Sequence, residues 1–349
     1  MSTKNKRTRR TFIQEVALLG AGATSLAVTE AKGQQGAAMA NPSTGSIPRR
    51  PLGKSDIEVS IIGMGGFHIG SADTQTVATE MVQHALDEGV NFFDNAWEYH
   101  DGQSEEWMGK ALGSRRNEAV LMTKVCTHGR DKHVAMQMLE ESLRRLRTDH
   151  LDVWQIHEVV YDNDPDMIFA PNGAAEALLQ AKKEGKVRLI GFTGHKDPAI
   201  HLRMLSHGFP FDTVQMPLNA FDATFRSFET HVLPEARKRE IAVFGMKSMG
   251  GGEMVKQGGV TPSEALRYAM SLPVATTISG INSPEVLKQN LEVVKSFSPM
   301  TGSEMDQLRN RCRGMAGDGH LELFKTTTMY DGKIGREQHG YPPAEELPA

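Results

Sequence analysis

The chain has 349 residues, with 39 basic and 43 acidic side chains and a formal net charge of −4. This mildly acidic balance gives no electrostatic reason to bind nucleic acid or an anionic membrane. Cys126 and Cys312 are the only cysteines, too few for a four-cysteine zinc site or an iron–sulfur cluster. Cys126 follows a strand-like run and is expected in the core, and spacing alone leaves open whether the two thiols pair.

Residues 1–40 are predicted to be an export signal of the twin-arginine type. A basic start contains the twin arginine at 9–10, an apolar run follows at 16–28, and a small-x-small cleavage site lies at 38–40. The apolar run is shorter than the roughly 20 residues that a spanning helix needs, so no stable membrane anchor is expected. The sequence therefore predicts a periplasmic protein carried by the twin-arginine export machinery, with residues 41–50 as an exposed lead-in.

Residues 51–300 alternate between strand-like and helix-like segments. The strand-like runs lie at 57–66, 91–99, 119–125, 151–158, 187–195, 212–219, 241–248 and 274–281. Helical patterns between them lie at 74–88, 104–112, 133–146, 174–185, 228–239 and 284–294. Strands that alternate with helices are parallel, and eight such units predict a (β/α)8 TIM barrel, here with an N-terminal hairpin. No G-x-G-x-x-G follows a strand, which argues against an open dinucleotide-binding sheet.

The last segment, 301–349, is predicted to be a C-terminal helix and a tail that cover the barrel. A short helix is expected at 304–313, and a Gly- and Thr-rich stretch follows it.

Four polar residues, Asp94, Tyr99, Lys124 and His157, close strand-like runs. The carboxyl ends of barrel strands converge on one mouth, so these side chains are expected to meet there. A Lys ammonium would stabilise a Tyr phenolate and lower the pKa of the phenol, and an Asp would hold the ammonium in place. Such a set suits protonation of a carbonyl oxygen. None of its members can supply hydride, so a nicotinamide cofactor is implied.

Six sequence runs between residues 50 and 295 resemble, in the same order, characteristic segments of the aldo-keto reductases. They are RPLGKSDIEVSIIGMGG, FFDNAWEY, LMTKV, LDVWQIHE, GFTGH and ISGINSPEVLKQNL. The D-x4-Y spacing is specific in combination with a Lys and a His at strand ends, although each feature alone is weak. The resemblance implies that Tyr99 is the general acid, Lys124 and Asp94 its tuning partners, and His157 the residue that orients a small carbonyl or alcohol substrate.

The same resemblance implies a nicotinamide cofactor, NADP(H) rather than NAD(H), held after strands five to eight. Backbone amides and the start of the last helix suit its phosphates. The residues at the matching positions are Thr193, Gln215, Asn219, Met246, Lys247, Ser248, Gly250, Gly280, Ile281, Ser283, Gln289 and Asn290.

Three features depart from the family's pattern. Thr193-Gly194 stands where the family usually has Ser-Asn, and Met246 replaces the aromatic residue that stacks on the nicotinamide. Gly280 and Val286 stand where basic residues often grip the 2′-phosphate, although Lys288 is near. The departures concern the cofactor side alone, because the four strand-end residues match.

Other interpretations of these residues remain open at this stage. A buried Asp–Lys pair can be purely structural, and a strand-end Lys also suits a Schiff-base aldolase. A second function is an exported barrel that binds a small molecule and whose catalysis is vestigial. Nicotinamide is scarce outside the cell, and the altered cofactor positions favour this alternative. Neither the substrate nor the oligomeric state can be named from the sequence.

A tryptophan and three histidines are further candidates for site residues. Trp97 either walls the substrate pocket or belongs to the core. His195, His201 and His207 are spaced by six, off one helical face, and are expected at the surface or rim. No metal site is expected.

Overall fold

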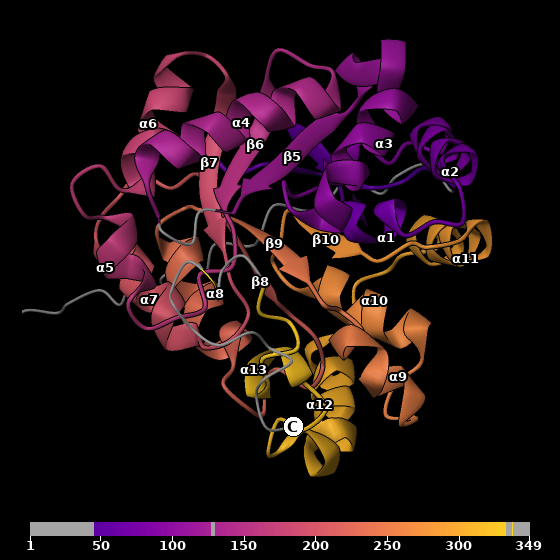
Figure 1. The fold of residues 1–349 in the computed structure, drawn as a ribbon. Coiled ribbons are helices and arrows are strands. Elements are labelled where there is room, and N and C mark those ends of the chain that lie inside the picture. The colour runs from indigo at the N-terminus through magenta and orange to yellow at the C-terminus, as the bar shows by residue number, and fades with distance from the viewer. Residues whose placement is uncertain (1–44, 127–129, 333–336, 338–349) are drawn as a thin grey trace, which may run out of the picture. The chain divides into compact units, whose positions relative to one another are not determined.

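The computed structural model describes residues 45–126, 130–332 and 337 (Figure 1). The predicted export signal, the start of the lead-in and the end of the tail lie outside the described residues. Within them, eight parallel strands close into a barrel in the order β10-β3-β4-β5-β6-β7-β8-β9. The predicted TIM barrel is therefore confirmed.

The barrel strands are short, and their bounds lie inside the predicted runs. They are β3 (Ile62–Gly65), β4 (Phe92–Asp94), β5 (Val120–Val125), β6 (Leu151–Ile156), β7 (Val187–Thr193), β8 (Thr213–Pro217), β9 (Ala242–Met246) and β10 (Thr276–Ser279). Neighbouring strands pair in parallel register, for example Lys124 with Gln155.

Helices surround the barrel and connect its strands (Figure 1). The longer ones are α2 (Gln75–Asp87), α3 (Gln103–Leu112), α4 (Lys132–Leu146), α6 (Ala174–Lys183), α7 (Pro198–Ser206), α8 (Phe228–Lys238), α10 (Pro262–Ser271), α11 (Pro284–Lys295) and α12 (Gly302–Ala316). The short ones are α1 (Gly66–Gly70), α5 (Asp164–Ile168), α9 (Glu253–Lys256) and α13 (Leu323–Thr326), with 3-10 turns η1 (Tyr99–Gly102), η2 (Gly113–Glu118) and η3 (Gly250–Gly252). None of the helices in the described ranges combines the length and apolar character needed to cross a membrane.

The predicted strand at 57–66 is wrong as a single element. Its first part, β2 (Glu58–Ser60), pairs antiparallel with β1 (Arg49–Pro51), and only its second part is the first barrel strand. The chain turns between them because two hydrogen bonds of 2.7 Å hold Ser60. Its hydroxyl donates to the carbonyl of Ile62, and its backbone N–H donates to Oδ1 of the distant Asn91. The antiparallel pair is the predicted N-terminal hairpin.

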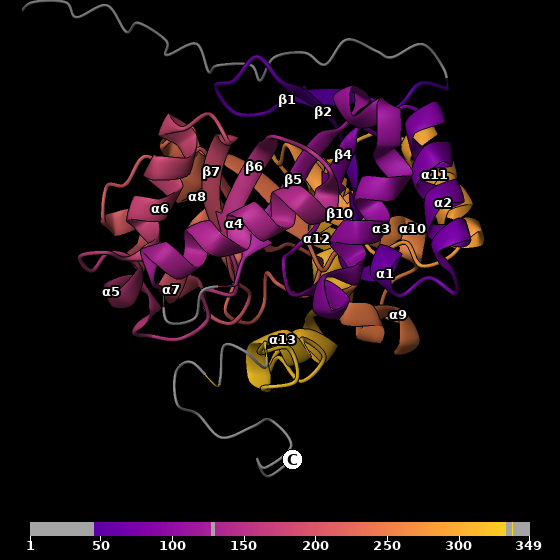
Figure 2. The same ribbon diagram turned by 45° about the horizontal axis from the view of Figure 1, so that its top comes forward.

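The hairpin closes the amino-terminal end of the barrel, opposite α13 (Figure 2). Its apolar side chains belong to the same buried cluster as the inward side chains of the strands. That cluster contains Leu52, Ile57, Val59, Phe92, Val120, Met122, Val153, Ala242, Phe244, Ala275 and Ile278. The lead-in was expected to be exposed, but Ile47 near its end is buried and packs in the larger core.

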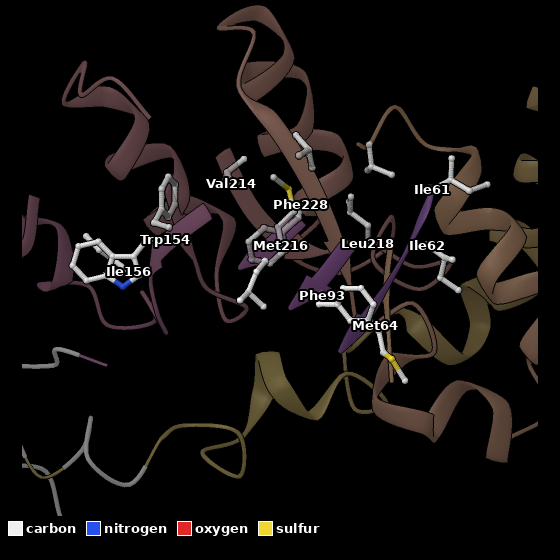
Figure 3. Close-up of a cluster of buried hydrophobic side chains, with 14 of the residues drawn as sticks. Ile61, Ile62, Met64, Phe93, Trp154, Ile156, Val214, Met216, Leu218 and Phe228 are labelled. Carbon is white, nitrogen blue, oxygen red and sulfur yellow. The ribbon is translucent and has the colours of Figure 1, made fainter. Parts of the chain in front are cut away.

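Side chains alternate along each strand between the barrel interior and the helical layer. In β5, Val120 and Met122 belong to the interior cluster, whereas Leu121 and Val125 belong to the larger core between strands and helices. Successive strand residues point to opposite faces, so Lys124 shares the inward face of Met122. Figure 3 shows part of the outer core, in which Phe93, Trp154, Val214 and Met216 come from strands and Phe228 from α8.

Arg50 ties the hairpin to the last barrel unit, and this contact is testable. Its guanidinium donates to the carbonyls of Met270 at 2.6 Å and Val274 at 2.7 Å. Because charge-assisted hydrogen bonds are stronger than neutral ones, Arg50→Ala is expected to lower the free energy of unfolding by about 2 kcal/mol.

The neighbouring Arg49 is exposed and provides the matched control. Arg49→Ala should change the free energy of unfolding in urea by less than about 0.5 kcal/mol. Equal losses in the two variants would show that the carbonyl contacts of Arg50 do not hold the hairpin.

Candidate active site

A buried ion pair lies at the carboxyl ends of β4 and β5. Lys124 Nζ donates to Asp94 Oδ1 and, at 2.7 Å, to the backbone carbonyl of Asn95. Both side chains are almost completely buried, and a buried ion pair persists only when its remaining donors and acceptors are satisfied. Burial raises the pKa of the Asp94 carboxyl and lowers the pKa of the Lys124 ammonium, and their mutual attraction opposes both shifts.

Tyr99 approaches this pair from a loop. The prediction that it closes a strand is wrong, because β4 ends at Asp94 and Tyr99 begins the 3-10 turn η1. Its hydroxyl lies 3.4 Å from Lys124 Nζ, and the ammonium lies 4.9 Å from the ring centroid. The phenol packs edge-on against Phe67 and His157, with ring centroids 5.4 and 5.5 Å away. The four predicted residues therefore do converge at one mouth.

The pKa of Tyr99 differs from the sequence-based expectation. Burial raises it well above its ordinary value, and the carboxylates of Asp94, Glu98 and Glu158 raise it further. The expected lowering by Lys124 does not dominate, because burial of the hydroxyl disfavours the phenolate more strongly. Tyr99 is consequently a protonated phenol, which suits a group that donates a proton.

His157 directly follows β6 and lies under the same mouth. Its Nδ1 lies 2.6 Å from Oε1 of Glu98, so the imidazole is paired with this carboxylate. Burial lowers the pKa of His157, and the nearby Glu98 carboxylate opposes this shift. The imidazole is therefore neutral near pH 7 and can offer one N–H and one lone pair.

Sequence reasoning missed two carboxylates and a thiol in this mouth. Glu98 precedes Tyr99, Glu158 follows His157, and the Cys126 thiol donates to Glu98 Oε2 at 2.6 Å. Burial raises the pKa of both the Glu158 carboxyl and the Cys126 thiol, and Glu98 raises both further. The sequence signal was an acidic neighbour beside Tyr99 and another beside His157, which strand alternation would place on the opposite face.

Trp97 contacts the helical layer. Its indole N–H donates to Glu141 Oε2 of α4 at 2.7 Å, and Arg145 lies over its ring, 5.2 Å from the centroid. These contacts give Trp97 a structural role, and its place in the substrate pocket stays a prediction.

The predicted nicotinamide residues lie on adjacent strand ends. Thr193 pairs with Gln215 in register, and Gln215 Nε2 lies 3.5 Å from Met246 Sδ. Gln215 is buried, and its Oε1 has no hydrogen bond in the part of the chain that the structure describes. The unsatisfied side-chain carbonyl of Gln215 lies beside the hydroxyl-bearing Thr193. This pair fits a ligand with a carboxamide group, whose N–H can donate to the Gln215 carbonyl.

The predicted phosphate residues lie in a glycine turn and at a helix start. Gly250, Gly251 and Gly252 all have positive φ (57°, 71° and 100°), which glycine adopts readily. Within this turn the N–H groups of Gly250 and Gly252 donate to the carbonyls of Lys247 at 2.9 Å and Met249 at 2.8 Å. Ser283 begins α11 and caps it by accepting from the backbone N–H of Val286 at 3.3 Å. An anion is favoured at such a helix start.

The remaining predicted cofactor residues differ in exposure. Asn290 is buried and donates to Ser279 Oγ at 3.0 Å, whereas Gln289 is exposed. Ser248 and Ile281 are buried. A Cβ on Gly280 would lie 2.4 Å from the His68 ring, so only glycine lets this ring approach β10.

A stretch that we name the C-terminal segment, residues 322–332, contacts the loops after β6 to β9. Lys325 Nζ is fully buried and binds Asp222 at 2.7 Å and Glu322 at 3.0 Å. Lys196 Nζ binds both carboxylate oxygens of Asp331, at 2.5 and 2.6 Å. The segment is thereby anchored by buried ion pairs over part of the mouth.

Two predicted cofactor residues contact this segment. Asn219 Nδ2 donates to Glu322 Oε1 at 3.2 Å, while its Oδ1 accepts backbone N–H groups of its own loop. Lys247 Nζ lies 4.5 Å from the Tyr330 ring centroid and 5.4 Å from that of Phe324. Burial lowers the pKa of Lys247 to about 8.

The expectation for the histidines is wrong in part. His201 is fully buried, because α7 packs it between Phe192 and Phe228, each with a ring centroid 5.0 Å away. His195 is also buried, and only His207 is exposed. Cys126 is buried as predicted, and both cysteines are free thiols.

Comparison with known proteins identifies the family. A sequence model of the Aldo/keto reductase family matches residues 61–262, more than half of the chain. The chain therefore belongs to the aldo/keto reductase family, whose members are NAD(P)-dependent oxidoreductases.

Two relatives from Bacillus subtilis show how far the likeness extends. Aldo-keto reductase YhdN is 30% identical over 205 residues, covering 54% of this chain and 58% of its own length. The chain thus spans less than two thirds of that relative. The uncharacterized oxidoreductase YqkF is 24% identical over 311 residues, covering 76% of this chain and 96% of its own length.

Solved structures share the fold. The holo form of aldo-keto reductase AKR11C1 from Bacillus halodurans has a TM-score of 0.66 at 23% identity, covering 79% of this chain and 99% of its own. Glycerol dehydrogenase AKR11B4 from Gluconobacter oxydans has a TM-score of 0.63 at 21% identity, covering 79% and 97%.

The protonation of Tyr99 can be measured directly. Because burial and nearby carboxylates raise its pKa well above the ordinary value, Tyr99 is expected to stay un-ionised at a pH of about 10, where a free phenol is half ionised. The phenolate absorbance of the wild type and of Tyr99→Phe should then superimpose through an alkaline titration up to that pH. A phenolate signal that is lost in the variant below a pH of about 10 would contradict this.

Glu322 makes the anchoring of the C-terminal segment sensitive to pH. Burial raises its pKa from 4.5 to about 7, with Asp222 adding to the shift and Lys325 opposing it. The folded state therefore holds a proton that the unfolded state releases. The stabilisation is complete below pH 4.5 and is lost as the pH rises to about 7.

Glu322→Gln removes this titration. The free energy of unfolding of the wild type, relative to that of the variant, should fall by up to about 3 kcal/mol between pH 5 and 8. Glu304→Gln, at the exposed capping box of α12, is the control and should show no such fall. Parallel pH profiles for the wild type and Glu322→Gln would be inconsistent with a buried, titrating Glu322.

Proposed function

We propose that this protein is an NAD(P)H-dependent aldo-keto reductase that interconverts a small carbonyl compound and the corresponding alcohol. The observation that carries the proposal is the Tyr99 hydroxyl at 3.4 Å from the buried Lys124, which is itself held by Asp94. His157 lies against the Tyr99 ring at the same mouth. Membership of the aldo/keto reductase family supports the reaction class.

The roles follow from the protonation states. Tyr99 carries its proton at neutral pH and donates it to the carbonyl oxygen of the substrate. The resulting phenolate then lies beside the Lys124 ammonium, whose charge stabilises it, and Asp94 holds that ammonium in place. The neutral His157 imidazole donates a hydrogen bond that orients the carbonyl. A bound nicotinamide would supply the hydride.

The residues present fit such a cofactor. Thr193 and the unsatisfied Gln215 Oε1 would hold the carboxamide, with Met246 beside them. The glycine turn at 250–252 and the start of α11 would bind phosphates, and Lys247 adds positive charge. We propose NADP(H) over NAD(H).

A second candidate is a small-molecule-binding barrel whose catalysis is vestigial. One observation favours it: Asn219 and Lys247 already contact the C-terminal segment. Either protein would be exported to the periplasm by the twin-arginine machinery, a proposal that rests on the sequence of residues 1–40. Fractionation of cells that express the wild type or Arg9→Lys/Arg10→Lys tests it, because the lysine pair should leave the chain in the cytoplasm.

Cofactor binding distinguishes the two candidates. Titration of the protein with NADPH and NADH, followed by fluorescence or calorimetry, should give saturable binding. Absence of binding to both at concentrations of about 1 mM would exclude the reductase and favour the binding barrel.

Tyr99→Phe tests the mechanism. Loss of the general acid should lower kcat by about 100-fold or more on a carbonyl substrate that the wild type accepts, while NADPH affinity is kept. The control is Tyr268→Phe, since Tyr268 binds Glu229 and Arg309 in the helical layer. Full turnover by Tyr99→Phe would refute the assigned role.

A further inference from the structure

The C-terminal segment, residues 322–332, places an aromatic side chain on the residues proposed to bind the phosphates of the cofactor. The ring centroid of Tyr330 lies 4.5 Å from Lys247 Nζ. The hydroxyl of the same tyrosine lies against Gly251 of the glycine turn. We propose that the C-terminal segment is an autoinhibitory strap, which holds Tyr330 in the phosphate site and which the cofactor must displace in order to bind.

Tyr330 packs closely on the backbone of the glycine turn. A Cβ on Gly251 would lie 2.7 Å from the Tyr330 hydroxyl oxygen and 3.6 Å from the ring carbon that bears it. Gly251 has a φ of 71°, so both its conformation and this contact favour glycine at the position. Protein interiors are close-packed, so a phosphate and the Tyr330 hydroxyl cannot fill the space beside Gly251 together.

Lys247 contacts neutral rings, although an anionic partner would compensate its charge better. Besides the Tyr330 ring, the Phe324 ring centroid lies 5.4 Å from Lys247 Nζ. Burial lowers the pKa of this ammonium to about 8, with Glu158 opposing the shift and Lys124 adding to it. A cation–π contact is generally weaker than a charge-assisted hydrogen bond to a phosphate, so a phosphate would compete with both rings for Lys247.

The two ends of the strap are anchored in different surroundings. At one end the Lys325 ammonium is fully buried between two carboxylates. At the other end Lys196 binds Asp331, the residue after Tyr330, and the Lys196 side chain is 19% exposed. Because water reaches the second pair and not the first, the strap is expected to open at Asp331 while Lys325 stays anchored.

The same end of the strap also contacts the proposed catalytic mouth. The backbone N–H of Gly332 donates to Glu158 Oε2 at 2.8 Å, and Glu158 directly follows His157 in the chain. A Cβ on Gly332 would lie 2.3 Å from that carboxylate oxygen, so the strap backbone packs tightly there. Displacement of Tyr330 by a cofactor would therefore also withdraw Gly332 from the mouth.

This inference rests on the proposed reductase function, because it concerns the site for the phosphates of the cofactor. A strap differs from a lid that closes over a bound cofactor. A lid makes its contacts with the ligand present, so the ligand stabilises the closed state, whereas a strap competes with the ligand and is released by it. The two therefore predict opposite effects of the ligand on the C-terminal segment.

Truncation of Tyr330 tests the strap. A ligand that binds only an open state has its apparent affinity lowered by the fraction of molecules that are open. In the full chain, Tyr330→Ala should therefore lower the dissociation constant for NADPH or NADH, measured by fluorescence titration, by about 10-fold. Met329→Ala is the matched control, because this neighbouring side chain is 72% exposed, and it should leave the dissociation constant unchanged. If Tyr330→Ala does not fold, as judged by circular dichroism, Asp331→Asn removes the pair with Lys196 and should give the same gain in affinity.

Hydrogen exchange of the wild type gives a second readout. A saturating nucleotide should speed amide exchange in residues 322–332, because the hydrogen bond from Gly332 to Glu158 is lost when the strap opens. Equal or weaker binding in the folded Tyr330→Ala variant, or slower or unchanged exchange with the nucleotide, would overturn the strap alone. Absence of binding to both nucleotides by the wild type and every variant at about 1 mM would overturn the reductase proposal as well. Binding by Tyr330→Ala and not by the wild type would support both proposals.

Discussion

Closure of the parallel barrel forces every second side chain of each strand into one shared interior. In β5 the apolar residues Val120 and Met122 fill that interior, and Lys124 follows them on the same face. The ammonium cannot reach water at the amino-terminal end, which the hairpin fills with apolar side chains. It can be satisfied only at the mouth, by Asp94 and the carbonyl of Asn95. The position of the site follows from this constraint, because the Lys124 ammonium must be paired at the carboxyl end of the barrel, where the apolar interior ends.

The rest of the mouth is organised around that neutralised charge. Tyr99 is buried beside this pair, and its burial raises the pKa of the phenol. Glu98 and Glu158 bring negative charge close to Tyr99 and, together with Asp94, raise the pKa of its hydroxyl further, so the phenol keeps its proton. The proposed reductase uses the proton that Tyr99 keeps.

Periodic and local patterns were readable in advance. Strand alternation places Asp94, Lys124 and His157 on the inward face. The helix α4 ends at Leu146 as predicted, and it begins after its cap Asp131, one residue before the predicted start. The helix α10 went unassigned although Thr261 and Glu264 form a capping box, so that signal was present and overlooked. The break at Ser60 was not readable, because its cause is a hydrogen bond to the distant Asn91.

The sequence by itself determined the eightfold alternation, the inward face of each strand and the family to which the chain belongs, since all three depend on residue order and period. Only the tertiary structure decided where Tyr99 lies, which sign its pKa shift takes, and that Glu98 and Glu158 meet His157. Those outcomes depend on loop conformation and on burial beneath the C-terminal segment. Burial and charge–charge distances arise between residues far apart along the chain, so no local pattern encodes them.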